Sequence, residues 1–332
     1  MLLLAGCAPA PPKTAGRLRV VTSIGVLADW ARQVGGDRVE VTSLLTGNES
    51  PHTYEIRPAD VKTIADARIL FRVGLGMEDW LDPAIENSGN KRLVIVDAAA
   101  GINDVIVDAD HRPKSEVRDQ KSERRKTEPD PRANSEARSE KLEVRTSESE
   151  SPAPNPQPLA PASGNPHIWL DPELAKVGIE NLVRELVKLD PKGESLYRQH
   201  EADYFVRLDS LSQAIKAQVA ALADRRFISF HDAWPYFCRR FGLEVVATVE
   251  PVPGQEPSAK QLARMVDLIR REHIRVVTTE PQLPSALPDM LARETGVKVV
   301  SLNPLESEGG YIATLGRAAQ ALADALQTPV QP

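Results

Sequence analysis

The sequence has only two cysteines, Cys7 and Cys238, among 332 residues. Two cysteines are too few for a disulfide framework or a cysteine-rich zinc module. Basic residues are not in excess either, because 41 Lys and Arg stand against 47 Asp and Glu, which gives a net charge of −6. This balance argues against a general nucleic-acid-binding protein, which would carry a basic excess. The chain also lacks any run of about 18 apolar residues, so the sequence predicts no transmembrane helix.

Residues 1–16 have the pattern of a lipoprotein signal remnant followed by a tether. Leu4-Ala5-Gly6-Cys7 matches a bacterial lipoprotein cleavage site, after which Cys7 becomes the lipidated first residue of the mature protein. A usual signal peptide also has a basic start and a longer apolar stretch, and because both are missing here we expect the natural start upstream. The proline-rich residues 8–16 predict a flexible or polyproline tether. A chance cysteine in a hydrophobic start is the alternative interpretation.

Residues 108–164 differ in composition from the rest of the chain. Between 111 and 150 there are 11 Lys and Arg and 10 Asp and Glu, but only five hydrophobic residues and no aromatic one. Five prolines follow between 151 and 164. Such a segment cannot bury enough apolar surface to offset the entropy that it would lose on ordering. We therefore predict a disordered, charged and proline-rich insert that interrupts one domain and does not separate two.

The remaining chain predicts an α/β fold with two similar lobes. Eight short runs rich in β-branched residues begin near Leu18, Val39, Arg68, Leu93, Phe227, Glu244, Ile274 and Val297. Helix-length segments lie between several of them, at 27–34, 58–67, 258–272 and 287–295. Short apolar strands that alternate with helices indicate parallel sheets with helices on both faces. Because the runs form two sets of four, we expect a parallel four-stranded sheet in each lobe.

One long rigid helix is expected to join the lobes. Apolar residues recur every three or four positions between Pro191 and Leu222, at Tyr204, Leu208, Leu211, Ile215, Val219 and Leu222. This spacing is one face of an α-helix, and Pro191 suits its first turn. About 30 helical residues span roughly 45 Å, so such a strut should limit hinge motion between the lobes. The expected division is an N-terminal lobe at 17–107 completed by 165–190, a linking helix at 191–224 and a C-terminal lobe at 225–328.

Three of the six histidines occupy positions where an α/β protein binds ligands. His52 follows the second predicted strand, and His231 ends the first predicted strand of the second half. Ligands bind beyond the carboxyl ends of such strands. His167 precedes a predicted helix. Position alone leaves each of the three open between a ligand and a structural side chain, because no local metal-binding motif joins them. We expect structural or solvated roles for His111, His200 and His273.

The segments around these three histidines resemble a known family. Pro-His-Thr-Tyr-Glu-Ile-Arg-Pro (51–58), Asn-Pro-His-Ile-Trp-Leu-Asp-Pro (165–172) and Phe-His-Asp-Ala-Trp-Pro-Tyr-Phe (230–237) are similar to motifs of the cluster A-I metal-binding solute-binding proteins of bacterial ABC importers. Residues 280–282 and 294–299 add to the match. The resemblance implies two α/β lobes on a rigid helix, with a zinc or manganese ion captured between them. It also implies delivery of that ion to a membrane permease.

The same resemblance implies that His52, His167 and His231 are the metal ligands. The family's fourth ligand is a carboxylate or a water molecule, and Glu306 lies where zinc-type lipoprotein members carry a glutamate. Glu308, Asn303 and water remain alternatives for this position. Glu280 could have a structural role at a turn, while Asp171 and Asp232 are candidates to accept the second N–H of a ligating histidine.

Three neutral imidazoles and one carboxylate suit a tetrahedral Zn²⁺ site, whereas Mn²⁺ prefers oxygen-rich sites. We therefore expect a non-enzymatic, monomeric, high-affinity Zn²⁺ receptor that is lipid-anchored outside the cytoplasm or periplasmic and serves an ABC permease. A Mn²⁺ receptor of the same family is the first alternative. A zinc metalloenzyme that activates water at an open fourth position is an alternative from another class. An adhesin that uses the receptor fold is a further alternative. The insert contains one histidine, His111, so we expect no metal-gathering role for it.

Overall fold

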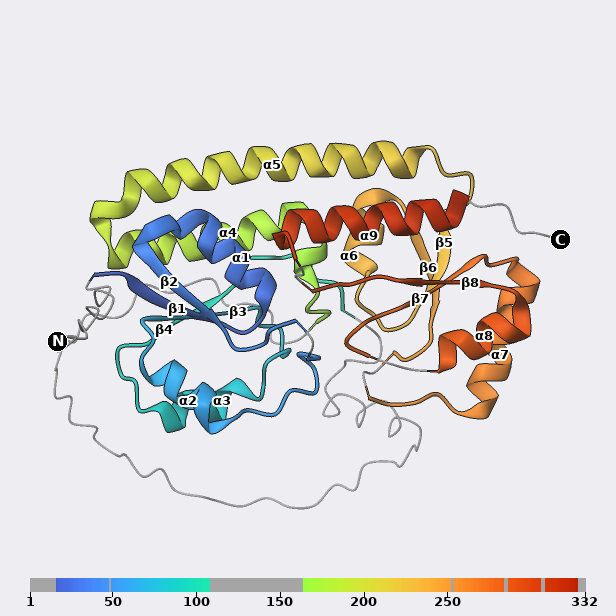
Figure 1. Cartoon of the computed structure of the whole chain (residues 1–332), viewed down its shortest axis with the longest axis horizontal. Helices are drawn as coiled ribbons and strands as arrows, with labels where there is room; N and C mark the ends of the chain where they lie inside the picture. The colour runs from blue at the N-terminus through green and yellow to red at the C-terminus, as the bar shows by residue number, and fades with distance from the viewer. Residues whose placement is uncertain are drawn as a thin grey trace, which may run out of the picture.

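The computed structural model describes residues 16–47, 49–107, 164–251, 254–283, 286–305 and 308–327. Cys7, Glu306 and nearly all of the predicted insert lie outside these residues. The described chain forms two α/β lobes that lie side by side under one long helix (Figure 1). This arrangement confirms the predicted fold class.

The N-terminal lobe contains a parallel four-stranded sheet in the order β2-β1-β3-β4. Its strands are β1 (Leu18–Thr22), β2 (Val39–Ser43), β3 (Ile69–Arg72) and β4 (Val94–Asp97). Its helices are α1 (Gly25–Gly35), α2 (Pro58–Ala65), α3 (Leu81–Ser88) and α4 (Pro172–Leu189). In Figure 1, α1 and α4 lie on one face of the sheet and α2 and α3 on the other. The central strands are accordingly apolar runs buried on both sides, as expected for a parallel sheet.

The C-terminal lobe repeats this plan, with a parallel sheet in the order β6-β5-β7-β8. Its strands are β5 (Arg226–Ser229), β6 (Glu244–Thr248), β7 (Val276–Thr279) and β8 (Lys298–Ser301). Its helices are α6 (Pro235–Phe241), α7 (Ala259–Glu272), α8 (Leu287–Thr295) and α9 (Gly310–Gln327). Because both sheets share one strand order, the carboxyl ends of corresponding strands lie in equivalent places in the two lobes.

The long helix α5 (Glu194–Ala220) has 27 residues and runs along both lobes (Figure 1). It begins three residues later than predicted, because Pro191–Gly193 forms a separate 3₁₀ turn. In that turn the backbone N–H of Gly193 donates to the carbonyl of Asp190, and the Asp190 carboxylate pairs with Arg38 at 2.6 Å. The predicted apolar face is buried throughout except at Leu211, which is half-buried.

The two lobes are joined by buried contacts as well as by α5. Asp29 of α1 accepts hydrogen bonds from the hydroxyl of Tyr204 on α5 at 3.0 Å and from the backbone N–H of Tyr311 on α9 at 3.2 Å. Arg240 of α6 donates to Asp171, the N-cap of α4, at 2.7 Å. One continuous hydrophobic core extends from the N-terminal sheet through α4 and α5 to α6 and α9. These contacts support the expectation of limited hinge motion.

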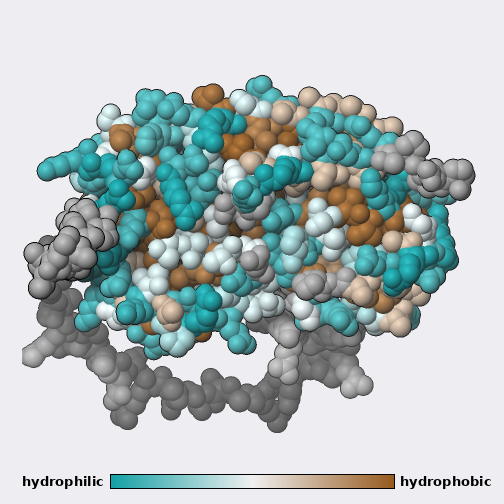
Figure 2. Space-filling model, in the orientation of Figure 1, coloured by the Kyte–Doolittle hydropathy of each residue, from teal (hydrophilic) through white to brown (hydrophobic). Residues whose placement is uncertain are grey.

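The surface of the described residues exposes few large hydrophobic side chains. The face shown in Figure 2 mixes hydrophilic and hydrophobic side chains. Three large hydrophobic residues are exposed in the described chain: Val107, Leu196 and Val206. Among the described helices, none combines the length and the apolar character needed to cross a bilayer.

Candidate metal centre

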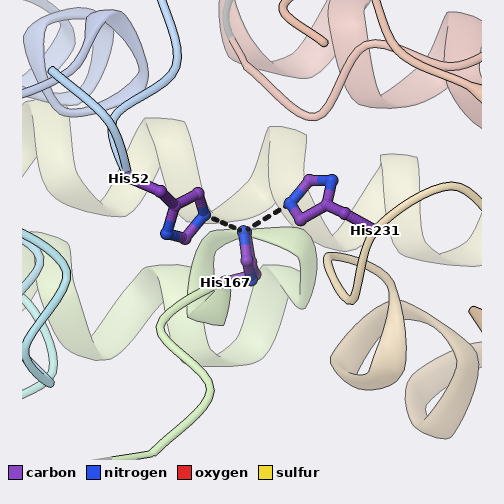
Figure 3. A group of neighbouring side chains, drawn as sticks. All are labelled: His52, His167 and His231. Carbon is purple, nitrogen blue, oxygen red and sulfur yellow. Dashed lines mark hydrogen bonds between the residues drawn. The ribbon is translucent and has the colours of Figure 1, made fainter. Parts of the chain in front are cut away.

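Three histidines from three distant segments meet between the lobes. The Nε2 atoms of His52 and His231 each lie 3.1 Å from the Nε2 of His167. The potential ligand atoms of all three lie within 4.8 Å of one another. Figure 3 shows the three rings pointing to a common centre. His52 follows β2, His231 follows β5, and His167 lies in the segment just before α4. The structure thus brings together the three histidines that the sequence singled out.

The loop that carries His52 is held by Trp80, which directly precedes α3. The indole N–H of Trp80 donates to the carbonyl of Pro51 at 2.9 Å. The Trp80 ring also packs edge-on against Tyr54, with ring centroids 4.9 Å apart. The Tyr54 hydroxyl in turn donates to Asp60 at 2.7 Å. His52, which is half-buried, therefore lies in a loop fixed on both sides of the histidine.

His167 is oriented by Asn165. The amide Nδ2 of Asn165 donates to the carbonyl and the carboxylate of Asp232, at 2.7 and 3.1 Å. This fixes the amide so that its oxygen faces His167, where it accepts from the backbone N–H at 3.1 Å and from the ring Nδ1 at 3.0 Å. With its proton on Nδ1, the buried His167 ring presents a lone pair on Nε2, which is the form that a metal ion requires.

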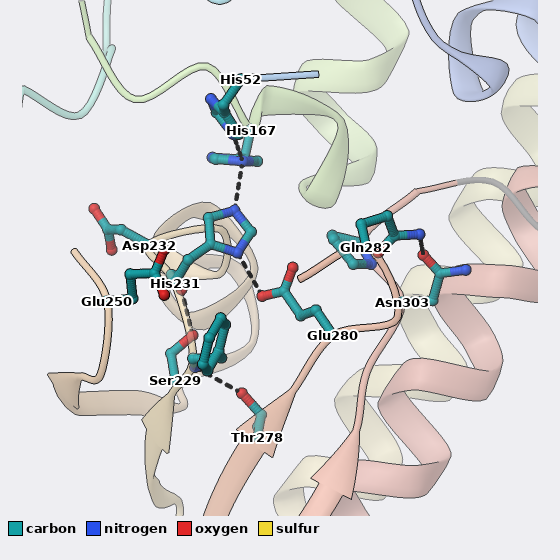
Figure 4. Close-up of polar contacts among 12 residues, drawn as sticks. His52, His167, Ser229, His231, Asp232, Glu250, Thr278, Glu280, Gln282 and Asn303 are labelled. Atoms are coloured by element: carbon teal, nitrogen blue, oxygen red, sulfur yellow. Dashed lines mark hydrogen bonds and ion pairs between the residues drawn. The ribbon is translucent and has the colours of Figure 1, made fainter. Parts of the chain in front are cut away.

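His231 is oriented by a buried carboxylate. Its Nδ1 lies 2.6 Å from Oε1 of Glu280, and the two side chains are 5% and 1% exposed. Glu280 follows β7 and also accepts a turn hydrogen bond from Leu283 through its carbonyl at 3.2 Å. Figure 4 shows the carboxylate directed at the ring. A carboxylate on the outer nitrogen of a ligating histidine fixes its tautomer and raises its basicity, and it brings negative charge beside the cation.

The nitrogen geometry fits a small divalent ion. Ligands at about 2.0–2.1 Å around a tetrahedral Zn²⁺ lie about 3.4 Å apart, close to the 3.1 Å seen between the Nε2 atoms. His167 and His231 both use Nδ1 for another hydrogen bond, so their Nε2 lone pairs face each other. Such a contact is repulsive unless a proton or a cation lies between the atoms. One metal ion at the common centre would satisfy all three nitrogens.

Other residues that the sequence singled out lie outside this cluster or outside the described chain. Glu306 is not among the described residues, although Leu305 before it lines the metal pocket. Asn303 uses its side-chain oxygen to accept from Gln282 at 2.9 Å and from the backbone of Leu305 at 3.0 Å. Glu308 is exposed.

The two aspartates predicted to accept a hydrogen bond from a ligating histidine bond other residues instead. Asp171 caps α4 and pairs with Arg240, while Asp232 holds Asn165, which then orients His167. The carboxylate on His231 is that of Glu280, which the sequence suggested only as a turn residue. Asn165 and Trp80 were missed as supporting residues, although the proximity of Asn165 to His167 in the sequence was a usable signal.

The other described histidines, His200 and His273, and the described cysteine, Cys238, lie outside the metal cluster. His200 contacts the carbonyl of Val34 through Nδ1 at 3.2 Å, and His273 ends α7 with a left-handed backbone. His111 is outside the described residues. Cys238 is buried, and burial raises the pKa of its thiol well above the ordinary value, which makes it unreactive.

Two α/β lobes joined by a long helix, with three histidine nitrogens between them, define a metal-binding solute-binding protein. The family ZnuA, described as zinc-uptake complex component A, periplasmic, matches residues 20–325, and the chain belongs to this family. Membership confirms the predicted resemblance and the transport class, so this is a binding protein of an ABC importer and not an enzyme. It implies a membrane permease as partner and a location outside the cytoplasm.

The relatives of this chain include both zinc and manganese proteins. The chain is 26% identical over 338 residues to the high-affinity zinc uptake system protein ZnuA of Bacillus subtilis, covering 98% of this chain and 94% of that protein. It is 24% identical over 304 residues to the manganese-binding lipoprotein MntA of Halalkalibacterium halodurans, covering 90% and 83%. A crystal structure of ZnuA superposes with a TM-score of 0.73 at 26% identity, covering 94% of this chain and all of the other. The family therefore establishes a zinc or manganese site, and identity near 25% does not separate the two metals.

Proposed function

We propose that this protein is a high-affinity Zn²⁺ receptor that captures the ion with His52, His167 and His231 and delivers it to its ABC permease. The observation that carries this proposal is the convergence of three Nε2 atoms, those of His52 and His231 each lying 3.1 Å from that of His167. His52 and His167 belong to the N-terminal lobe and its completing segment, and His231 belongs to the C-terminal lobe. Capture between the lobes would shield the ion from solvent until the permease docks.

The donor set favours zinc over manganese. Imidazole is a borderline ligand that suits Zn²⁺, whereas Mn²⁺ is better matched by carboxylate, carbonyl and water oxygens. Zn²⁺ also binds a given nitrogen and oxygen site more tightly than Mn²⁺ in the Irving–Williams order. The carboxylate of Glu280 bonds the outer nitrogen of His231. Its charge supports either metal, so the preference for zinc rests on the three nitrogens.

Metal titration of the stripped full-length chain tests the proposal. A ligand that binds only the folded state stabilises it by RT ln(1 + [L]/Kd), which is about 4 kcal/mol at a thousandfold excess over Kd. We expect one equivalent of Zn²⁺ to bind and to raise the melting temperature clearly. The variant His231→Gln should lose most of this effect, and the matched variant His200→Gln, outside the site, should keep it.

The competing readings give different results in the same titration. A tighter response to Mn²⁺ than to Zn²⁺ would keep the receptor and overturn the choice of metal. Absence of any metal-dependent shift would overturn the receptor itself. The sequence favoured Glu306 as the fourth ligand and left Glu308, Asn303 and water as alternatives. Glu306→Gln separates Glu306 from water, because it should weaken Zn²⁺ binding only if the Glu306 carboxylate coordinates the ion.

Membrane attachment through Cys7 is a separate part of the proposal. It is supported by the Leu-Ala-Gly-Cys pattern and by the periplasmic location of the family's proteins. Metabolic labelling with a fatty acid should mark the wild-type protein expressed with a complete leader and not the Cys7→Ser variant. Equal labelling of the two would rule out lipidation at this residue.

A further inference from the structure

Two buried oxygen atoms in the metal pocket have no hydrogen-bond partner among the described residues. They are Ser50 Oγ and Gln282 Oε1. Both side chains belong to residues that are only 9% exposed, and both residues line the pocket that contains the three histidines. Native proteins rarely leave a buried polar atom unpaired, and each exception requires an explanation such as a bound water or ion.

The orientation of the Gln282 amide is fixed by its surroundings. Its Nε2 donates to the carbonyl of Gly47 at 2.7 Å. It also donates to Oδ1 of Asn303 at 2.9 Å (Figure 4). Oδ1 of Asn303 also accepts from the backbone N–H of Leu305 at 3.0 Å, so this atom is the oxygen of its amide. Both neighbours of Nε2 are therefore acceptors. The amide cannot be turned to exchange its oxygen and nitrogen, and Oε1 is left for another partner.

The two oxygens come from different lobes and stand close in sequence to site residues. Ser50 lies two residues before His52, in a turn closed by a hydrogen bond from the Thr53 N–H to the Ser50 carbonyl at 3.4 Å. Gln282 lies two residues after Glu280, the residue that orients His231. Gln282 also reaches the N-terminal lobe through Gly47. The pair thus belongs to the junction at which the ion is held.

The lining of the pocket suits a small polar molecule bound to the ion. Apart from the histidines, Glu280, Ser50 and Gln282, the lining residues are largely apolar: Pro51, Trp169, Leu283, Pro304 and Leu305. A buried water needs two to four polar partners. In this pocket the unpaired oxygens of Ser50 and Gln282 are available as two of them.

We propose that Ser50 Oγ and Gln282 Oε1 hold the water molecule that completes the shell of the captured ion. Three imidazoles leave one position of a tetrahedral ion open. A water bound there through its oxygen has two hydrogens to donate, and the pocket offers two neutral acceptors for them. The inference rests on the proposed function, since it assigns the fourth ligand of the same metal site.

The role of these two residues predicts a loss of metal affinity without a loss of folding. Residues that support the shell of a metal typically change affinity by about 10- to 100-fold when removed. We expect Ser50→Ala and Gln282→Met to weaken Zn²⁺ binding by about 10-fold each. Because both act on one water, the double variant should lose less than the product of the single losses. Ser50→Ala removes an unpaired hydroxyl, so the melting temperature of its metal-free form should not fall.

The experiment is a competition titration of the full-length chain with Zn²⁺ against a chromophoric chelator, together with the visible spectrum of the Co²⁺ form. Ser210→Ala and Gln199→Met, on the exposed side of α5, are matched controls and should bind as the wild type does. Asn303→Ala distinguishes a Gln282 that binds the water from a Gln282 that only positions its loop. This variant removes one hydrogen-bond partner of Gln282 Nε2 and leaves Gln282 Oε1 in place. It should cost clearly less affinity than Gln282→Met, and only the latter should change the Co²⁺ spectrum.

Three results would overturn the assignment. The first is wild-type affinity in both Ser50→Ala and Gln282→Met. The second is an equal loss in Asn303→Ala and Gln282→Met with unchanged Co²⁺ spectra, which would make Gln282 a loop-positioning residue. The third is a large loss in Glu306→Gln with a Co²⁺ spectrum that loses a carboxylate ligand, which would put Glu306 in place of the water. A wild-type chain that binds no metal would instead refute the proposed function.

Discussion

Replacing Glu280 with Gln should weaken Zn²⁺ binding about 10-fold while the metal-free protein stays folded. Oε1 of Glu280 lies 2.6 Å from Nδ1 of His231, and both side chains are almost completely buried. The amide oxygen of Gln can still accept the hydrogen bond from Nδ1, so the ring keeps its tautomer and direction. The substitution removes the negative charge and little else, and that charge counts most when a cation is bound to Nε2.

The expected magnitude follows from the two kinds of hydrogen bond. A hydrogen bond to a charged group contributes about 1.5–3 kcal/mol, against about 0.5–1.5 kcal/mol between neutral groups. The difference of about 1–1.5 kcal/mol corresponds to about a 10-fold change in Kd. This lies at the lower end of the range for residues that support a metal ligand. The free energy of unfolding of the metal-free protein should change by less than this, because no cation then interacts with the carboxylate.

A competition titration with a chromophoric zinc chelator measures the change, and urea unfolding of the metal-free form checks the fold. Glu86→Gln, an exposed glutamate on α3, is the matched control for loss of one negative charge. Unchanged affinity in Glu280→Gln would refute the reasoning, because the buried charge would then not act on the ion. A metal-free variant that no longer unfolds cooperatively would show that the carboxylate is needed for folding instead.

Three further predictions concern the scaffold. Burial raises the pKa of Glu78 from 4.5 to about 7, and this effect exceeds that of its hydrogen bonds, which lower the pKa. The folded state therefore binds the proton more tightly than the unfolded chain does. The free energy of unfolding should therefore fall by up to about 3 kcal/mol as pH rises from 4.5 to 7, and urea titrations of the metal-free protein should show this component vanish in Glu78→Gln. Gly310 has a φ of 82°, and a Cβ at this position would lie 2.8 Å from Oδ1 of Asp29. Gly310→Ala should therefore lower the free energy of unfolding by about 1–3 kcal/mol. An unchanged urea midpoint would contradict this prediction. Small-angle scattering should show almost the same radius of gyration with and without Zn²⁺, whereas a large compaction would disprove limited lobe motion.

Much of the fold could be predicted because it depends on local patterns. The eight strands are short β-branched runs, and the alternation with helices is sufficient to indicate parallel sheets. The buried face of α5 follows from residues spaced three or four apart. The start of α5 was less predictable, because Pro191 can open an α-helix or a 3₁₀ turn. Here the contacts of Asp190 with Arg38 and of Gly193 with Asp190 decide between them.

The site was predictable in its nitrogens and not in the groups that support them. Strand ends and motif resemblance pointed to His52, His167 and His231 before their geometry was known. The bond between Glu280 and His231 joins residues 49 positions apart, and no sequence period encodes such a pairing. The unpaired oxygens of Ser50 and Gln282 were equally hidden, since a missing hydrogen bond becomes visible only when the neighbours of an atom are in place.

X-ray absorption at the zinc edge of the one-to-one complex tests the central claim most directly. If His52, His167 and His231 hold the ion between the lobes, the spectrum should fit three imidazole nitrogens at about 2.0–2.1 Å and one oxygen in a four-coordinate shell. Replacing any one of the three histidines by Ala should remove one imidazole from the fit. A shell that contains fewer than three imidazoles in the wild-type protein, or six oxygens, would contradict the account.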